Sequence, residues 1–549
     1  MSVNIGGQNA IILKEGTSRT QGREAQHANI EAALVIAESI KSSLGPKSMD
    51  KMLVDGFGDV TISNDGATIL DEMDVQHPAA KTMVEIAKTQ DDEVGDGTTT
   101  VVVLAGELLS KAESLMDKDV HPTQVIDGYS LAEKKSVEFL QKIAIKINPT
   151  DKAMLKKIAI VSIASKLLSE HKDYVADIAV KAVLEVAEKT GTGYAVDIDN
   201  IKIEKKPGGS LIDTALIQGI LLDKEVVHPG MPKRVENCKI ALLNCPLEIE
   251  KPEFDSKLNI DNPDQMKRFL DEEEKLLREM VEKIASVGAN VVVCEKGIDD
   301  SVQHFMAKKN ILAVRRVKQS DMEKLTKATG AHIITNITDL KSSDLGHAKL
   351  TEERKVSDDK MTFIEGCKDP KALTILVRGG TERVVDEAER AMHDGLCVVR
   401  DVVVQPQVVV GGGATETEIA RMLRNYAEKL SGKEQLAVQA FADSLETIPM
   451  ILAENAGMDP INSLMELRAK HQGKQRWAGI DPFKGRITDL SKLDVYEPLA
   501  VKIQAVKSAG EAAGMLLKID DVIAASKSKD GAGGPKGPKD SAKEEGEGD

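Results

Sequence analysis

Aromatic side chains, basic charge and long apolar runs are all scarce in this chain of 549 residues. Aromatics make up 3% of it, Trp477 is the single tryptophan, and the formal net charge is −16. Because base stacking needs aromatic platforms and phosphate binding needs a basic face, these values argue against nucleic acid as the main partner. No segment approaches the ~18 consecutive apolar residues of a membrane span, and the N-terminus lacks the charged start and apolar core of a secretory signal. We therefore expect a cytoplasmic protein without a membrane partner.

Cysteine pairs are missing as well. The five cysteines are Cys238, Cys245, Cys294, Cys367 and Cys397, an odd number with no Cys-x-x-Cys spacing. A disulfide framework and a structural zinc site are both disfavoured by this pattern. We expect reduced thiols that are buried as small apolar groups.

Residues 95–100, with the sequence Gly-Asp-Gly-Thr-Thr-Thr, are the most informative stretch that is present. The glycines let the backbone wrap closely around a ligand, and residues 101–109 read as the apolar start of a helix. A glycine-rich turn that opens a helix presents free N–H groups and the positive end of the helix dipole to an anion. Asp96 would repel a bare phosphate, so Mg²⁺ should lie between them. The segment predicts a magnesium–nucleotide cradle, with an ordinary threonine-capped helix as the alternative.

The chain before residue 145 is predicted to be mainly helical, with one hairpin. Apolar spacing favours a helix over residues 25–43, and strands are expected at Lys51–Val54 and Val60–Ser63. Asp65 then lies at a strand-to-helix corner, where a functional carboxylate can be held rigidly. The alternative is that Asp65 only caps the next helix.

Residues 239–337 alternate short apolar runs with helical patterns, the order of an α/β domain. Strands are expected at 240–243, 291–294, 311–314 and 332–335, and helices at 301–308 and 322–329. Residues 248–287 contain a long helix with one apolar and one highly charged side, preceded by a leader at 254–260 that carries apolar residues. This segment is either a protruding arm that contacts a partner or client, or an amphipathic helix on its own core.

The last third returns to helices. A strand at 374–380 ends in a glycine pair, and a helix over 382–403 follows, with Asp394 beside its apolar stripe. Gly411-Gly412-Gly413 precedes another expected helix at 416–429. Residues 526–549 are rich in Gly, Pro, Lys and Glu and are expected to be disordered. Strand-like pieces at 10–13 and 515–519 would expose edges that need partners.

Five motifs occur in the order seen in group II chaperonins, and the archaeal thermosomes are the branch that the chain resembles most. They lie at residues 44–52, 64–70, 95–100, 378–382 and 411–413. The resemblance covers nearly the whole chain. It implies a chaperonin fold, multi-domain α/β and α, with a mainly helical ATP-binding equatorial domain, a small α/β intermediate domain and an α/β apical domain with a helical protrusion.

The resemblance also implies a division of the chain into discontinuous domains. The equatorial domain would span 1–148 and 405–527, the intermediate domain 149–216 and 370–404, and the apical domain 217–369, with a protrusion at about 248–287 and a disordered tail at 528–549. Family members form two stacked rings of eight or nine subunits that enclose non-native polypeptides. ATP binding and hydrolysis close a built-in lid over these clients, and hairpins equivalent to residues 51–63 pair with the strands of a neighbouring subunit.

The family's site residues transfer to matching positions in this chain. The phosphates would be contacted by Ser43, Leu44, Gly45 and Pro46 together with Gly97, Thr98, Thr99 and Thr100. Asp96 would hold Mg²⁺, Gly412 and Glu497 would lie near the nucleoside, and Asp65 and Asp394 would position and polarise the attacking water. Lys166 resembles the lysine that senses the γ-phosphate, with a solvated surface lysine as the alternative. The sequence Asp481-Pro482 departs from many relatives and leaves the base contacts there in doubt.

Two other classes of protein compete with an ATP-hydrolysing chaperonin. A metabolite phosphotransferase is disfavoured because the chain has neither a Gly-x-x-x-x-Gly-Lys-Ser/Thr loop nor the protein-kinase motifs. A passive ring scaffold is disfavoured by the aspartates at 65, 96 and 394. Phosphoryl transfer mainly requires placement and charge stabilisation, for which such carboxylates suffice.

Overall fold

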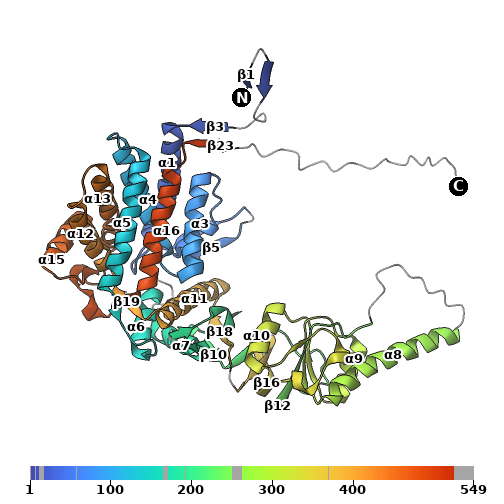
Figure 1. The fold of residues 1–549 in the computed structure, drawn as a ribbon. Helices are drawn as coiled ribbons and strands as arrows, with labels where there is room; N and C mark the ends of the chain where they lie inside the picture. The colour runs from blue at the N-terminus through green and yellow to red at the C-terminus, as the bar shows by residue number, and fades with distance from the viewer. Residues whose placement is uncertain are drawn as a thin grey trace, which may run out of the picture.

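The computed structural model describes residues 2–5, 8–11, 18–56, 58–164, 171–191, 193–249, 263–368 and 370–524. The predicted tail at 526–549, the leader at 254–260 and Lys166 lie outside these residues. Figure 1 shows a helical body built from the first and last parts of the chain, a smaller mixed layer beneath it, and a sheet-containing part from which one long helix projects. Each part has its own buried apolar cluster.

The helical body is assembled from two stretches of chain that are far apart in sequence. Its core combines apolar residues of 30–143 with those of 409–517. The helices are α1 (Arg23–Ile40), α2 (Gly66–Asp71), α3 (Pro78–Val94), α4 (Thr98–Met116), α5 (Pro122–Ile143), α12 (Ala414–Ala427), α13 (Lys433–Leu445), α14 (Thr447–Asn455), α15 (Pro460–Gln472) and α16 (Leu499–Leu517). The strands around it are β1 (Ser2–Ile5), β2 (Gln8–Ile11), β3 (Ser18–Gln21), β4 (Lys51–Val54), β5 (Val60–Ser63), β20 (Ala478–Asp481), β21 (Arg486–Asp489) and β23 (Asp521–Ala524).

Helix α4 is the centre of this body because it is apolar on nearly every side, as a fully buried helix should be. It packs against α1, α3, α13 and α16. Gly106 on α4 permits the close approach of α1, since a methyl group there would lie 2.5 Å from the Cβ of Ala37. The packing around α4 therefore joins the first and last parts of the chain.

The smaller mixed layer lies between the helical body and the large sheet (Figure 1). Its elements are β6 (Ile145–Lys146), α6 (Lys152–Ile163), α7 (Lys172–Val186), β7 (Glu188–Thr190), β8 (Gly193–Ala195), β9 (Ile201–Pro207), β10 (Ala215–Ile217), β18 (Leu373–Gly379), α11 (Glu382–Val404), β19 (Gln407–Val410) and β22 (Tyr496–Pro498). Strand β18 pairs in parallel with β9 and antiparallel with β10. Strand β19 pairs with both β6 and β22. It joins this layer to the helical body, because Val408 packs in the core of the layer and Val409 in the core of the body.

The third part is a seven-stranded mixed sheet with helices against it. Its elements are β11 (Gly219–Leu222), β12 (Arg234–Leu243), α8 (Pro263–Ser286), β13 (Val291–Cys294), α9 (Asp300–Lys308), β14 (Leu312–Val314), α10 (Gln319–Thr329), β15 (Ile333–Ile334), β16 (Gly346–Val356) and β17 (Asp359–Glu365). The strand order is β11-β17-β16-β12-β13-β14, with β15 paired to β12. Helix α8 buries only Leu277, Val281 and Ile284 near its C-terminal end. The rest of α8 projects away from the sheet (Figure 1), as a protruding arm would.

Most predicted elements are confirmed, and one is wrong. The hairpin strands β4 and β5 have the predicted bounds, and α1, α8, α11 and α12 form where helices are expected. Residues 515–517, however, belong to α16 and not to a strand, because Leu516 and Leu517 continue a helical face that packs into the core. A short apolar run cannot by itself distinguish a strand from the end of a buried helix. The terminal strand is β23, which pairs antiparallel with β3 of the same chain.

All five cysteines are buried and none of them forms a disulfide, as expected. Burial raises the pKa of the Cys294 thiol to about 12 and that of the Cys367 thiol to about 11, so both remain protonated at neutral pH. Among the described residues, one stretch is long and apolar enough to cross a membrane by composition alone, Lys433–Asn455. It comprises α13 and α14, and 67% of its most apolar window is buried in the helical body.

Candidate nucleotide site

The glycine-rich motif forms the sharp connection between α3 and α4. Gly95 and Gly97 have positive φ angles of 65° and 79°, which favour glycine. A Cβ atom at Gly95 would come within 2.2 Å of the Cβ of Cys397 on α11. The Gly97 N–H donates to Asp96 Oδ1 at 2.6 Å, and α4 begins at Thr98. The start of a buried helix is thus open to an anion, with one carboxylate beside it.

A cavity of about 620 Å³ lies at this point. Of the predicted site residues, it is lined by Leu44, Gly45, Pro46, Asp96, Gly97, Thr100, Gly412 and Glu497. Its remaining walls are largely apolar and come from α6, α14, the β20–β21 hairpin and the start of α16. This volume suits a molecule of nucleotide size. The structure therefore brings together motifs that are separated by up to several hundred residues in sequence.

Several predicted residues are outside the lining of this cavity. Ser43 is buried, and its hydroxyl donates to the Ile40 carbonyl at 2.7 Å. Thr98 and Thr99 are buried in the first turn of α4. Asp65 and Asp394 are positioned by other contacts, and Lys166 is outside the described residues.

Asp65 is an N-cap, as the alternative interpretation anticipated. Its Oδ2 accepts from the Thr68 N–H and from the Thr68 hydroxyl, both at 2.9 Å. Its Oδ1 accepts from the Thr98 hydroxyl at 3.3 Å, which places the carboxylate against the first residue of α4. Capping and a role in the site are therefore compatible, because the cap holds the carboxylate beside the motif.

Asp394 lies on α11 next to two groups that were not singled out from the sequence. Ligand atoms of Asp394, His393 and Asp91 all lie within 4.8 Å of one another. Burial, and then the charge of Arg400, lower the pKa of His393, so its imidazole is neutral at neutral pH. Asp91 belongs to the last turn of α3, just before the glycine-rich motif. Helix α11 therefore brings the buried Asp394 to the edge of the nucleotide-binding region.

Glu497 is held by a buried lysine. The ammonium of Lys502 on α16 forms an ion pair with Glu497, and it lies 2.7 Å from Glu416 Oε1 at the start of α12. Burial disfavours the lysine charge, but the two glutamates outweigh this effect and raise the pKa of Lys502. A Cβ atom at Gly411 would meet Glu497 Oε1 at 2.1 Å, so the glycine leaves room for this carboxylate.

Three of the four carboxylates that line the cavity are paired within the protein: Asp481 with Arg486, Asp494 with Lys157 and Glu497 with Lys502. Among the described residues, the fourth, Asp96, forms no ion pair. A hard divalent cation would pair with this carboxylate and with phosphate oxygens. The residues present thus fit Mg²⁺ at Asp96.

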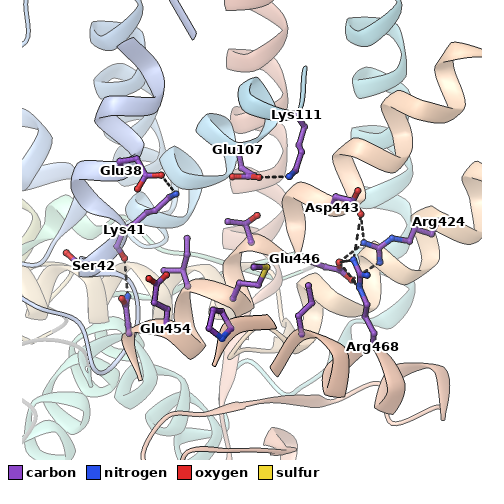
Figure 2. A pocket seen from close by; sticks show the side chains of 16 residues that line it. Glu38, Lys41, Ser42, Glu107, Lys111, Arg424, Asp443, Glu446, Glu454 and Arg468 are labelled. Carbon is purple, nitrogen blue, oxygen red and sulfur yellow. Dashed lines mark hydrogen bonds and ion pairs between the residues drawn. The ribbon is translucent and has the colours of Figure 1, made fainter. Parts of the chain in front are cut away.

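A second, larger cavity of about 840 Å³ lies on the other side of α14. Figure 2 shows the side chains that line it. Most of its charged side chains pair with one another. Lys41 pairs with Glu38, Lys111 with Glu107 at 3.1 Å, and Arg424 and Arg468 both with Glu446. Each of its four cations is thus neutralised by the protein itself. Among the described lining residues only Glu454 has no ion pair, so this cavity offers no free cation to a phosphate.

The helical body combines both ends of the chain and holds a helix start suited to an anion, and a mixed layer links it to a sheet-containing part with a projecting helix. This architecture defines a protein of chaperonin type. The TCP-1/cpn60 chaperonin family model matches residues 36–527. The chain is 58% identical over 537 residues to the thermosome subunit beta of Thermococcus kodakarensis, covering 98% of each chain. It is also 58% identical over 519 residues to the thermosome subunit of Methanopyrus kandleri, covering 94% of this chain and 95% of that one.

The chain therefore belongs to the TCP-1/cpn60 chaperonin family. Within it, the chain is a group II chaperonin, a subunit of an ATP-dependent double ring that folds other proteins. The chaperonin fold predicted from the sequence is confirmed.

Sequence reasoning missed Asp91, His393, Glu416 and Lys502. Asp91 is four residues before Gly95, and His393 is adjacent to Asp394, so proximity along the chain could have found both. Glu416 begins the helix after the triple glycine, but its lysine partner lies 86 residues further on. Nothing in the local pattern signals that pairing.

Proposed function

We propose that this chain hydrolyses magnesium-bound ATP in the 620 Å³ cavity and uses the cycle to close its projecting helix over non-native polypeptides. The observation that carries the proposal is the convergence of residues 44–46, 96, 97, 100, 412 and 497 on one cavity at the start of α4. The residue boundaries that the sequence predicts for the equatorial, intermediate and apical domains are part of this proposal.

The phosphates would lie against the backbone N–H groups at the start of α4 and against the loop 44–46. Gly45, with φ of 91°, packs against Leu452 so closely that a Cβ atom would lie 2.5 Å from Leu452 Cδ2. The loop backbone is therefore firmly seated on α14. When bound at Asp96, Mg²⁺ would neutralise phosphate charge. Thr100, Gly412 and Glu497 would border the remaining parts of the nucleotide.

Asp65 and Asp394 would orient and polarise the attacking water. Asp65 is fixed by its bonds to Thr68 and Thr98, whereas Asp394 is on α11, in the layer that joins the helical body to the large sheet. A movement of that layer would move Asp394 relative to the phosphates. Hydrolysis could in this way be coupled to lid closure.

The assembly is proposed to contain eight or nine copies per ring, identical or paralogous, in the cytoplasm. The hairpin β4–β5 exposes Met52 and Val54, and the two-stranded sheet β3–β23 has free edges. Pairing of the hairpin with that sheet in a neighbouring subunit would remove both edges. The exposed side chains Met266, Phe269, Leu270 and Leu276 on α8 would meet clients or other lids.

The direct test is an ATPase assay on the purified ring, combined with electron microscopy with and without Mg-ATP. We expect magnesium-dependent turnover and a change of lid position when nucleotide is added. Turnover that is absent in the assembled ring, or a lid that never moves, would contradict the proposal. A chain that stays a single subunit at every concentration would contradict the ring.

A further inference from the structure

We propose that His471, protonated on both ring nitrogens, is a positioning residue that holds the β20–β21 hairpin against the nucleotide cavity. The inference rests on the proposed function, because its consequence is measured as nucleotide affinity. His471 lies near the end of α15 and is outside the lining of the cavity.

The imidazole of His471 connects three elements. Its Nδ1 lies 2.9 Å from Glu418 Oε2 on α12, and its Nε2 lies 2.9 Å from the carbonyl oxygen of Ala478, the first residue of β20. The His471 side chain is 0% exposed, and that of Glu418 is 7% exposed. Both bonds are therefore shielded from water, which makes their loss costly.

The two partners determine how many protons the ring carries. A backbone carbonyl can only accept, so Nε2 must donate to Ala478. An ionised carboxylate also only accepts, so Nδ1 must donate to Glu418. A singly protonated imidazole would set a lone pair against one of these oxygens. The geometry therefore requires one extra proton on the His471–Glu418 pair.

Arg421 decides where that proton resides. Its guanidinium donates to both oxygens of Glu418, at 2.5 Å to Oε1 and 3.1 Å to Oε2. Burial would favour the neutral acid, but the bonds from His471 and Arg421 outweigh it and lower the pKa of Glu418. The proton thus belongs to the imidazole, and Glu418 is an anion between two cations.

The hairpin that His471 holds is a wall of the nucleotide cavity. Ile480, Asp481, Pro482 and Phe483 line the cavity, and the Ile480 N–H donates to the Gly412 carbonyl at 2.9 Å. This second bond joins the hairpin to the triple glycine. Helix α15 also anchors the other strand, because Lys470 Nζ donates to the Ile487 carbonyl on β21 at 2.6 Å. The end of α15 therefore sets the position of both strands.

A pair of substitutions separates the bond to Ala478 from mere packing. In His471→Asn the amide nitrogen occupies the place of Nδ1 and cannot reach Ala478. In His471→Gln the amide nitrogen occupies the place of Nε2 and can still donate to it. If His471 only filled space in the core, Gln would have no advantage over Asn. His471→Gln is therefore the conservative variant that should restore nucleotide affinity.

The experiment measures Mg-ADP dissociation constants by calorimetry, together with KM and kcat for ATP, on the assembled full-length protein. We expect His471→Asn to weaken Mg-ADP binding about tenfold and to raise KM, with kcat within about twofold. His471→Gln should remain within about threefold of the wild type. Ser463→Ala, a buried position at the other end of α15, is the matched control and should change nothing.

Equal affinity in His471→Asn and the wild type would overturn the inference, and so would an equal loss in the Asn and Gln variants. If His471→Asn does not assemble, Glu418→Ala serves instead, because it removes the acceptor that orients the imidazole towards Ala478. We expect weaker Mg-ADP binding there too, and unchanged binding would overturn the inference. A wild-type ring that fails to bind Mg-ADP at all would instead contradict the proposed function.

Discussion

The two cavities of the helical body share a wall and yet differ in almost every property that matters for chemistry. Helix α14 separates them, with Ile448 and Leu452 facing the nucleotide cavity and Met450 and Ile451 facing the charged one. Asn455 links the segments beside both, since its amide donates to the carbonyls of Lys41 and Leu44. The charged cavity is the larger of the two, at about 840 Å³ against about 620 Å³.

The comparison teaches that charge already paired within the protein stabilises a fold, while charge left uncompensated marks a site. In the charged cavity, Glu446 is 1% exposed and accepts from two arginines. In the nucleotide cavity, Asp96 has no cationic partner among the described residues. The first arrangement needs no ligand, and the second gains most from a bound cation.

The sharpest way to break this comparison is to neutralise one acid from each region. Asp394→Asn should reduce ATP turnover by about 100-fold or more, because a group that polarises the attacking water is lost. Asp443→Asn in the charged cavity, the matched control, should stay within about twofold. Steady-state ATPase assays on assembled rings decide the matter, and unchanged turnover in Asp394→Asn would rule out its role in the reaction.

Glu446→Gln should have the opposite effect, lowering the stability of the protein without impairing nucleotide binding. It leaves two arginines without their shared anion and should lower the free energy of unfolding by about 3 kcal/mol, with little effect on the KM for ATP. Burial opposes the ionised form, but Arg424 and Arg468 hold the pKa of Glu446 below its ordinary value of 4.5. Its contribution is therefore present above pH 4.5 and is lost as the pH falls through the lower folded-state pKa.

Denaturant unfolding at fixed protein concentration measures this loss. Glu454→Gln, on the same cavity wall, is a suitable comparison, because Glu454 forms no ion pair with any described residue. A large change in KM with intact stability would show that the charged cavity takes part in nucleotide binding.

Gly95→Ala tests how tightly α11 is packed against the glycine-rich motif. The new Cβ would need the positive φ of 65° and would clash with Cys397, so we expect a loss of about 2 kcal/mol in unfolding free energy. Gly380→Ala is the control, since open space surrounds that glycine and its φ is not positive. Thermal unfolding of both variants provides the measurement, and equal midpoints would contradict the packing argument.

Asp401→Asn should have the smallest effect, and one that depends on pH. Because burial raises the pKa of Asp401 from 3.8 to about 7, the folded state holds more protons than the unfolded state between these values. The stability of the wild type must then fall relative to the variant as the pH rises through that window. Between pH 5 and pH 8 we expect a relative change on the order of 1 to 2 kcal/mol in favour of Asn. A relative stability that is flat with pH would contradict the raised pKa.

The sequence sufficed for those parts of the fold and site that depend on neighbours along the chain. The hairpin β4–β5, helix α11 and the glycine turn before α4 each have a local signal in turn residues or periodicity. The capping role of Asp65 can also be predicted from the local sequence, since its partner Thr68 is three residues away.

The features that the sequence did not predict depend on residues that are distant along the chain. Lys502 is paired with Glu416, and His471 with Glu418, 53 residues apart, and no periodicity relates these positions. The apolar run at residues 515–519 predicts a strand, but such a short run is equally compatible with the end of a buried helix. The tertiary contacts of α16 with α3, α4 and α5 decide that it is helical up to Leu517.

The assembly of the helical body from both ends of the chain has a consequence for how this protein is made. Helix α4 ends at Met116, whereas α16, which packs against it, begins only at Leu499. At ~5–20 residues per second, a ribosome needs on the order of a minute to reach the second helix after the first. During that interval the apolar flank of α4 has no permanent cover. A chaperonin that folds other proteins must therefore itself pass through a partly folded state with exposed apolar surface during its synthesis.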